Sequence, residues 1–158
     1  MYYLRKKKPK KKEPDALPLF DQAGVKVSRK TDYVKKLDKI FSLYIRLRDT
    51  LPGGLTPCIS CGQYKRFDKM DCGHYYSRRH MATRFDEDNC HAECSQCNRF
   101  RADHLIGYRE NLLRKIGQQR FDKLAWKASQ TRHWTDFELK ELIKYYQEKI
   151  NEIKKQRP

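Results

Sequence analysis

The spacing of apolar residues predicts several helices along this chain. Apolar side chains recur at i, i+3 and i+4 through residues 32–48, which is the pattern of a helix with one buried face. The Leu-Pro-Gly-Gly segment at 51–54 predicts where this helix ends. A second helical pattern covers residues 105–116, and Gly117 suits a left-handed cap at its end. These two regions are therefore predicted to enclose the middle of the chain.

A last helix is predicted from the capping box Thr135-Asp-Phe-Glu138. Beyond this motif an apolar stripe continues at helical spacing as far as Ile153. Such a stripe on a terminal helix either packs on its own domain or forms the seam of a homodimer. The sequence leaves both alternatives open, so a homodimer is one of the assemblies that we expect.

Between the first two helical regions the apolar pattern becomes shorter. Extended segments at 64–67 and 70–76 are predicted to pair with each other as a β-hairpin. Residues 77–88 form a charged loop, and a short helix is predicted to begin near Ser95. We therefore predict the α+β class, with a small strand-and-helix core flanked by N- and C-terminal helices.

Composition divides the 158 residues into a terminal arm and one domain. Residues 1–30 are rich in Lys and Pro and poor in apolar residues, so they are predicted to be a basic, disordered arm. The domain is predicted to contain an N-terminal helix and turn at 31–55, the core at 56–103 and a C-terminal helical region at 104–158.

The charge of the chain points to a polyanionic partner. Lys and Arg number 36 against 20 Asp and Glu, the net charge is +16, and the mean hydropathy is −1.01. Nucleic acid is the commonest large polyanion, and an anionic membrane surface is the rival. The chain shows neither a transmembrane stretch of roughly 20 apolar residues nor the apolar segment of a signal peptide. We expect a cytoplasmic protein that binds DNA and no membrane.

Six cysteines in a reducing compartment favour metal ligation over disulfides. Four of them form two CxxC pairs, a spacing that lets their thiolates converge on one structural Zn²⁺. These four are Cys58, Cys61, Cys94 and Cys97. Cys72 and Cys90 lie outside the pairs, either as small buried residues or as a replacement within the ligand set. The zinc ion is predicted to hold the two ends of the core together.

Four polar residues between and just after the CxxC pairs suit metal-assisted phosphodiester hydrolysis. A neutral histidine accepts a proton from water near neutral pH, which makes His74 a candidate general base. Carboxylate and carboxamide oxygens are the ligands that Mg²⁺ or Mn²⁺ prefers, and Asp71 and Asn98 supply them. Asn89 completes the set. Each residue alone is weak evidence, but together with the zinc pairs they predict a nuclease site.

These motifs carry a resemblance to known enzymes. Cys94-x-x-Cys97-Asn98, with Asn89 before it and Gly73-His74 on the preceding strand, resembles the HNH or ββα-metal endonuclease motif, also called the His-Me finger. More narrowly, the chain resembles the phage lambda NinG (Rap) recombination endonucleases over roughly residues 32–153. The segments that carry this likeness are Tyr44-Ile-Arg-Leu-Arg-Asp49, Cys58-Ile-Ser-Cys61-Gly62, Asp71-Cys-Gly-His-Tyr75, and Arg84-Phe-Asp-Glu-Asp-Asn-Cys-His91 with Cys94-Ser-Gln-Cys-Asn98. The basic arm is expected to lie outside it.

The resemblance implies a role for each of these positions. His74 matches the general base, and Asn98 matches the metal ligand after the last cysteine. Asn89 matches the middle residue that orients the histidine loop. Many HNH enzymes have a second metal ligand directly before the histidine, where this chain has Gly73. Asp71 is two residues further back on the same face of the strand, and we expect it to replace that ligand.

Five arginines near the site in sequence are candidates to bind DNA. Guanidinium forks fit phosphate oxygens, so at least one is expected to brace the scissile phosphate. Their spacing does not say which one. They are Arg78, Arg79, Arg84, Arg99 and Arg101.

The first functional hypothesis is a metal-dependent endonuclease that acts on branched recombination intermediates such as Holliday junctions and D-loops. The resemblance also implies a phage or prophage gene expressed in a bacterial host, with recombination proteins as candidate partners. Two alternatives remain. One is a non-catalytic zinc module that binds nucleic acid through its charge. The other is an HNH nuclease of homing or restriction type, which would cut linear duplex at a specific sequence.

Overall fold

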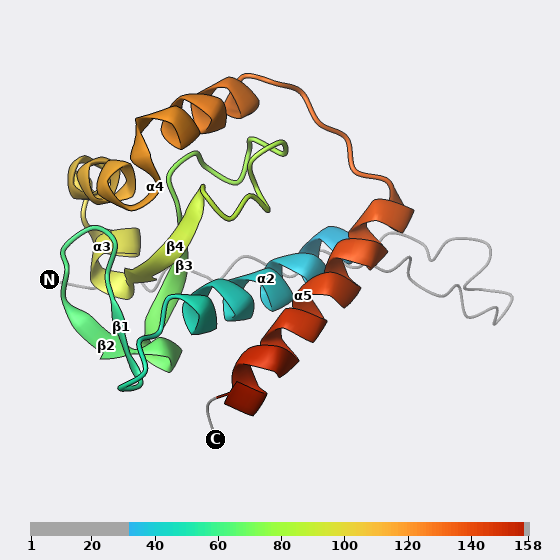
Figure 1. Cartoon of the computed structure of the whole chain (residues 1–158). Coiled ribbons are helices and arrows are strands. Elements are labelled where there is room, and N and C mark those ends of the chain that lie inside the picture. The colour runs from blue at the N-terminus through green and yellow to red at the C-terminus, as the bar shows by residue number, and fades with distance from the viewer. Residues whose placement is uncertain (1–31, 157–158) are drawn as a thin grey trace, which may run out of the picture. The chain divides into compact units, whose positions relative to one another are not determined.

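We describe the fold from a computed structural model of the chain, which defines residues 32–156 (Figure 1). Helix α2 (Tyr33–Arg48) begins after Asp32. The Asp32 side chain accepts a hydrogen bond from the Lys35 backbone N–H at 3.0 Å, which satisfies a donor that the first turn leaves unpaired. The first predicted helix is therefore confirmed. The predicted arm at 1–30 lies outside the described residues.

Two small antiparallel sheets follow α2. In the first, β1 (Leu55–Pro57) pairs with β2 (Tyr64–Arg66). In the second, β3 (Met70–His74) pairs with β4 (Cys90–Cys94). Every residue of β4 is buried. The four described helices and these two sheets agree with the predicted α+β class.

The predicted pairing of 64–67 with 70–76 was wrong, because each segment has a different partner. The first CxxC pair turns the chain back on itself. The backbone N–H of Cys58 donates to the Gln63 carbonyl at 2.9 Å, and this turn brings β2 beside β1. A 3₁₀ turn, η1 (Phe67–Lys69), then redirects the chain into β3. The partner of β3 is reached only after the long 75–89 loop.

Helix α3 (Ser95–Phe100) starts directly after β4, as predicted. Strand β3, strand β4 and α3 therefore form a compact strand–strand–helix unit (Figure 1). Helix α4 (His104–Ala128) is broken at Gly117, where φ is 77° and ψ is 163°. The glycine does interrupt the helix, but its ψ is extended and not that of the expected left-handed cap. Positive φ at this position favours glycine.

Helix α5 (Asp136–Gln156) begins with the predicted capping box. The Glu138 N–H donates to Thr135 Oγ1 at 3.2 Å, and Glu138 Oε2 accepts from the Thr135 N–H at 2.9 Å. The helix packs along α2 (Figure 1), with the rings of Phe41 and Tyr146 4.8 Å apart. Of the two alternatives for the apolar stripe, packing on its own domain is the one observed.

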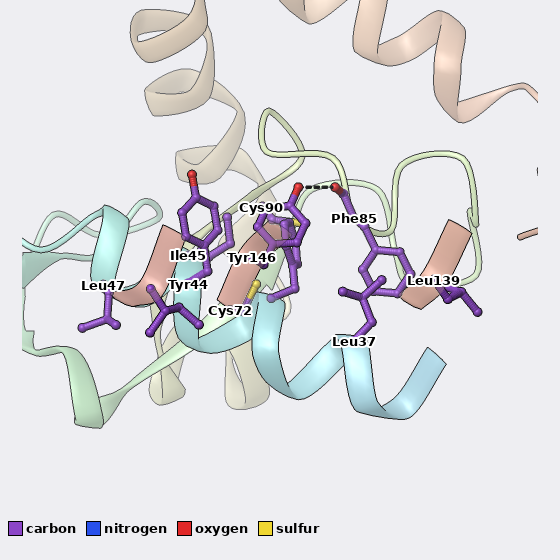
Figure 2. Packing of buried hydrophobic residues seen from close by; sticks show 11 residues of the cluster. Leu37, Tyr44, Ile45, Leu47, Cys72, Phe85, Cys90, Leu139 and Tyr146 are labelled. Atoms are coloured by element: carbon purple, nitrogen blue, oxygen red, sulfur yellow. Dashed lines mark hydrogen bonds between the residues drawn. The ribbon is translucent and has the colours of Figure 1, made fainter. Parts of the chain in front are cut away.

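The main core lies between α2, α5 and one face of the β3–β4 sheet (Figure 2). The Tyr146 hydroxyl donates to the Phe85 carbonyl at 3.4 Å, so this buried phenol has a partner. Burial of each large apolar side chain contributes roughly 1.5–3 kcal/mol. The core therefore anchors the sheet that carries the candidate site. Its members are Leu37, Phe41, Tyr44, Ile45, Leu47, Cys72, Phe85, Cys90, Leu139, Tyr146 and Ile150. Within residues 32–156, no helix has the length and apolar content to cross a membrane.

Candidate functional site

The four cysteines of the CxxC pairs meet at one end of the β3–β4 sheet. All four Sγ atoms lie within 4.8 Å of one another. The Cys94 backbone N–H also donates to Cys58 Sγ at 3.3 Å, a contact that stabilises a thiolate ligand. The cluster can hold a metal ion such as zinc, because four sulfur donors at this spacing suit a tetrahedral ion. The members are Cys58, Cys61, Cys94 and Cys97.

Cys72 and Cys90 are not part of that sulfur cluster. Both are buried in the core between α2 and α5, as expected for small apolar residues. Burial raises the pKa of the Cys90 thiol well above its usual range. The fold therefore brings the four expected zinc ligands together, and Cys72 and Cys90 form a separate group with His74, whose ligand atoms also lie within 4.8 Å of one another.

Asp71 and Asn98 contact each other beside the sulfur cluster, β3 supplying the first and α3 the second. Asn98 Nδ2 donates to Asp71 Oδ2 at 3.1 Å. Arg99 grips the same carboxylate through Nε at 2.8 Å and Nη2 at 2.7 Å. Burial raises the pKa of Asp71, but the hydrogen bonds from Arg99 and Asn98 outweigh it and lower the pKa overall. Asp71 is therefore ionised at neutral pH.

His74 ends β3 and lines the same cleft as Asp71 and Asn98, which has a volume of about 580 Å³. Its Nδ1 lies 3.2 Å from the Cys72 carbonyl and its Nε2 lies 3.1 Å from the Arg84 carbonyl. Burial, and then the Arg78 charge, lower the pKa of His74 to about 4. The imidazole is therefore neutral at pH 7. A neutral ring donates through only one nitrogen, so the other nitrogen carries a lone pair.

Asn89 does not face the cleft but supports the loop between β3 and β4. Its side chain is fully buried. Its Oδ1 accepts from the Tyr76 N–H at 2.7 Å, and its Nδ2 donates to the Tyr76 and Thr83 carbonyls at 2.9 and 3.0 Å. The amide has a partner for each of these groups, so it ties the segment after His74 to the start of β4. This geometry agrees with a residue that positions the histidine loop.

The family model described as Bacteriophage Lambda NinG protein matches residues 4–156 of the chain. The chain belongs to the NinG family. This match extends into the basic arm, so the expectation that the arm lies outside the likeness was wrong.

Individual relatives of this NinG-family chain come from several phages. Protein ninG of Escherichia phage 933W is 32% identical over 127 residues, which cover 79% of this chain and 60% of that protein. The proteins ninG of Escherichia phage lambda and Salmonella phage P22 are also 32% identical over 127 residues, covering 79% of this chain and 59% of each. The chain thus spans about three fifths of the length of these relatives. No solved structure matches it.

Two of the five candidate arginines in this NinG-family chain line the cleft, Arg78 and Arg99. Arg99 is mostly exposed where it contacts Asp71. Arg78 lies close enough to His74 for its charge to lower the histidine pKa. These two guanidinium groups are therefore the candidates that share the cleft with His74.

The other three arginines are engaged elsewhere. Arg84 binds Asp38 of α2 through Nε at 3.0 Å, so it fastens the loop to the helix. Arg101 pairs with Asp103 at 3.0 Å. Arg79 lines a separate hollow near the end of α4. Of the five arginines that lie near the site in sequence, the fold thus places two in the cleft, and the expectation that at least one braces a phosphate stays a prediction.

The sequence interpretation missed a buried acid beside the cleft. Glu93 lies opposite Asp71 in the sheet and is fully buried. Its Oε1 accepts from Ser60 Oγ at 2.5 Å and lies 2.7 Å from His104 Nδ1, while its Oε2 has no partner. A Cβ atom at Gly73 would lie 2.3 Å from that Oε2. The absence of a side chain at Gly73 thus leaves space for Glu93. The sequence signal for this buried acid was a glutamate directly before a cysteine of the second CxxC pair.

Proposed function

We propose that this NinG-family protein is a metal-dependent endonuclease that hydrolyses phosphodiesters in branched recombination intermediates. One observation carries the proposal: Asp71, His74 and Asn98 line one cleft directly beside a four-sulfur cluster. The order strand, strand, helix that holds them is the order of a ββα-metal unit. A structural zinc on the four sulfurs would keep the two strands and α3 in register.

His74 acts as the general base in this proposal. Its imidazole is neutral above its pKa of about 4, so at pH 7 it has a lone pair to accept a proton from water. A hydrogen bond to one backbone carbonyl holds the ring, and the other nitrogen, which lies close to a second carbonyl, takes the proton once the ring turns toward the water. Asn89 keeps the loop after His74 in place and does not touch the substrate. It is therefore a positioning residue.

Asp71 and Asn98 are the candidate ligands of the catalytic cation. A carboxylate and a carboxamide offer oxygen donors, which fit Mg²⁺ or Mn²⁺ and not a sulfur-seeking ion. When bound, such an ion stabilises the charge that develops on the phosphate. Arg99 now holds the Asp71 carboxylate, and its guanidinium fork also fits phosphate oxygens. Arg99 can therefore release the Asp71 carboxylate and bind a DNA phosphate in its place.

DNA is the proposed substrate because the chain carries a net charge of +16 and two arginines of the cleft are available to phosphates. The branched form of that DNA rests on the family resemblance. Four-way junctions present paired strands to cut, so a homodimer and recombination proteins belong to the same proposal as partners.

The test is a cleavage panel of linear, forked and four-way DNA with Mg²⁺, Mn²⁺ or EDTA. We expect cutting of the branched substrates with either ion and none with EDTA. His74→Ala should reduce the rate at least about 100-fold, the usual contribution of a general base. His133→Ala is the matched control, because His133 is exposed and outside the cleft. Sequence-specific cutting of linear duplex would instead identify a homing or restriction type of HNH enzyme.

A second candidate is a zinc module that binds nucleic acid without cutting it. The contacts of the cleft favour this candidate in one respect. Both Asp71 oxygens accept hydrogen bonds and both His74 nitrogens face carbonyls, so the groups proposed to bind the cation and take the proton already have partners. Tight, salt-sensitive binding with no nicking under any divalent ion would decide for this candidate.

A further inference from the structure

Three large apolar side chains near the cleft are exposed to solvent. Phe100, the last residue of α3, is 81% exposed, more than any other large apolar residue in the described part of the chain. Ile106 and Leu105, in the first turn of α4, are 67% and 42% exposed. None of them belongs to the buried clusters of the described residues or packs against one. Single exposed apolar residues are ordinary, but three within seven positions call for an explanation.

Their chain neighbours form one edge of the cleft. Arg99, next to Phe100, holds Asp71 at 2.7 Å. His104, next to Leu105, also lines the cleft. Only the short turn at 101–103 separates α3 from α4 (Figure 1). Phe100 and Leu105 therefore directly follow, in the chain, two residues that line the cleft at which the DNA strand is proposed to be cut.

The charge around Phe100 decides which occupant suits this edge. Arg99 and Arg101, each ion-paired with an aspartate, precede and follow it in the chain, and the protein as a whole carries a net charge of +16. A second copy of the chain would bring the same positive charge to the contact, whereas a nucleic acid brings phosphates. Every base has a flat π-face that an aromatic ring can stack on, whatever the sequence. Phe, Leu and Ile are also the side chains that proteins insert between bases to unstack them.

We propose that Phe100, supported by Leu105 and Ile106, stacks on an unpaired or unstacked DNA base next to the strand held in the cleft. This inference rests on the proposed function and narrows its substrate. A continuous duplex keeps its bases stacked, whereas the branch point of a fork or junction offers bases that leave the stack at little cost. The protein would thus select branched DNA through an aromatic contact and not through base sequence.

The experiment measures binding and base unstacking with cleavage switched off by EDTA. A fork carrying 2-aminopurine at the branch is compared with a linear duplex carrying it at an internal position, for the unmutated full chain, Phe100→Ala and Phe137→Ala. Phe137 is the matched control, because it is 72% exposed but lies in α5, which lines no part of the cleft. Zinc content and far-UV circular dichroism verify that each variant is folded.

We expect 2-aminopurine fluorescence at the branch to rise with the unmutated protein and with Phe137→Ala, but not with Phe100→Ala. Phe100→Ala should weaken binding to the fork roughly 5- to 150-fold, the range for loss of one base stack, and change binding to linear duplex by less than about 2-fold. Phe100→Trp should restore both the signal and the affinity.

Three results would overturn the inference. These are an unchanged fluorescence signal with Phe100→Ala, an equal loss of affinity for fork and duplex, or a shift from dimer to monomer in sedimentation, which would assign this edge to self-association. Failure of the proposed nuclease activity is a separate result. In that case the unmutated protein cuts nothing with Mg²⁺ or Mn²⁺, yet the Phe100-dependent signal in EDTA persists.

Discussion

The loop that follows His74 depends on one buried amide, so Asn89→Ala is an informative perturbation. Asn89 makes three hydrogen bonds at 2.7, 2.9 and 3.0 Å to Tyr76 and Thr83. Alanine removes all three and leaves the Tyr76 N–H and carbonyl without a partner, while the Thr83 carbonyl keeps its hydrogen bond from the Asp86 N–H at 3.1 Å. The side chain is fully buried, so solvent does not replace these bonds without rearrangement of the loop.

The size of the effect follows from the two groups left unpaired and from the lost bond to Thr83. A buried donor or acceptor left unpaired costs roughly 1–3 kcal/mol. Partial relaxation of the loop offsets some of this, so we expect a loss of about 3–5 kcal/mol in the free energy of unfolding. That is a large share of the roughly 5–15 kcal/mol that stabilises a domain. With a urea slope of roughly 1–3 kcal/mol per molar, the midpoint should fall by at least about 1 M.

Urea unfolding followed by far-UV circular dichroism, with zinc in excess, measures this loss. Asn111→Ala is the matched control, because the Asn111 amide donates to the Ile59 carbonyl at 2.7 Å and accepts from the exposed Arg114 side chain at 2.9 Å. Loss of these two bonds, one of them to a solvent-exposed partner, should cost about 1–2 kcal/mol. Two results would refute this reasoning: a free energy of unfolding for Asn89→Ala within about 0.5 kcal/mol of the unmutated value, or a loss no larger than that of Asn111→Ala.

Three further predictions concern the metal, the pH dependence and the packing of the sheet. A strong chelator, or Cys58→Ser, should unfold the domain, because a structural zinc contributes roughly 10–16 kcal/mol to folding in small zinc domains. The Cys72→Ser variant should keep its zinc. Metal analysis measures the zinc content of each variant, and circular dichroism measures its folding. Folding lowers the pKa of His74 from 6.5 to about 4. Between pH 6.5 and 4 the unfolded chain therefore binds more protons than the folded chain, so the free energy of unfolding should fall as the pH drops through this range. His74→Gln should flatten that slope in urea titrations, and an unchanged slope would contradict the assignment. Gly73→Ala places a Cβ 2.3 Å from Glu93 Oε2 and should cost roughly 1–3 kcal/mol, while Gly53→Ala, whose Cβ would meet nothing within 4 Å, should be nearly neutral in the same titrations.

The helices could be predicted from the sequence because their signals are local. The Thr135–Glu138 capping box lies at the start of the helix that it predicts, and the apolar spacing lies within each helix. The sulfur cluster was equally accessible, since the CxxC spacing itself prescribes the convergence of the four cysteines. The placement of His74 and Asn98 in one cleft followed from the family motif, and that of Asp71 from its position on the same strand face as the residue before His74.

The remaining features depend on contacts between distant parts of the chain. Strand β3 pairs with β4 across the 75–89 loop, and no local pattern distinguishes that partner from β2. Arg84 was assigned to DNA because its ion-pair partner, Asp38, lies 46 residues away on α2. Glu93 was missed because its environment, buried against Gly73, arises only when the two strands meet. Local sequence therefore predicts the elements, and tertiary contacts decide which polar groups remain available for function.

The central claim is that Asp71 and Asn98 hold a divalent cation beside the His74 imidazole. Anomalous diffraction from a crystal of the protein soaked in Mn²⁺ tests it most directly. We predict a manganese peak within ligand distance of the Asp71 carboxylate and the Asn98 amide oxygen, and its loss in Asp71→Ala. A map with manganese bound elsewhere, or with no peak between these two side chains at saturating Mn²⁺, would contradict the claim.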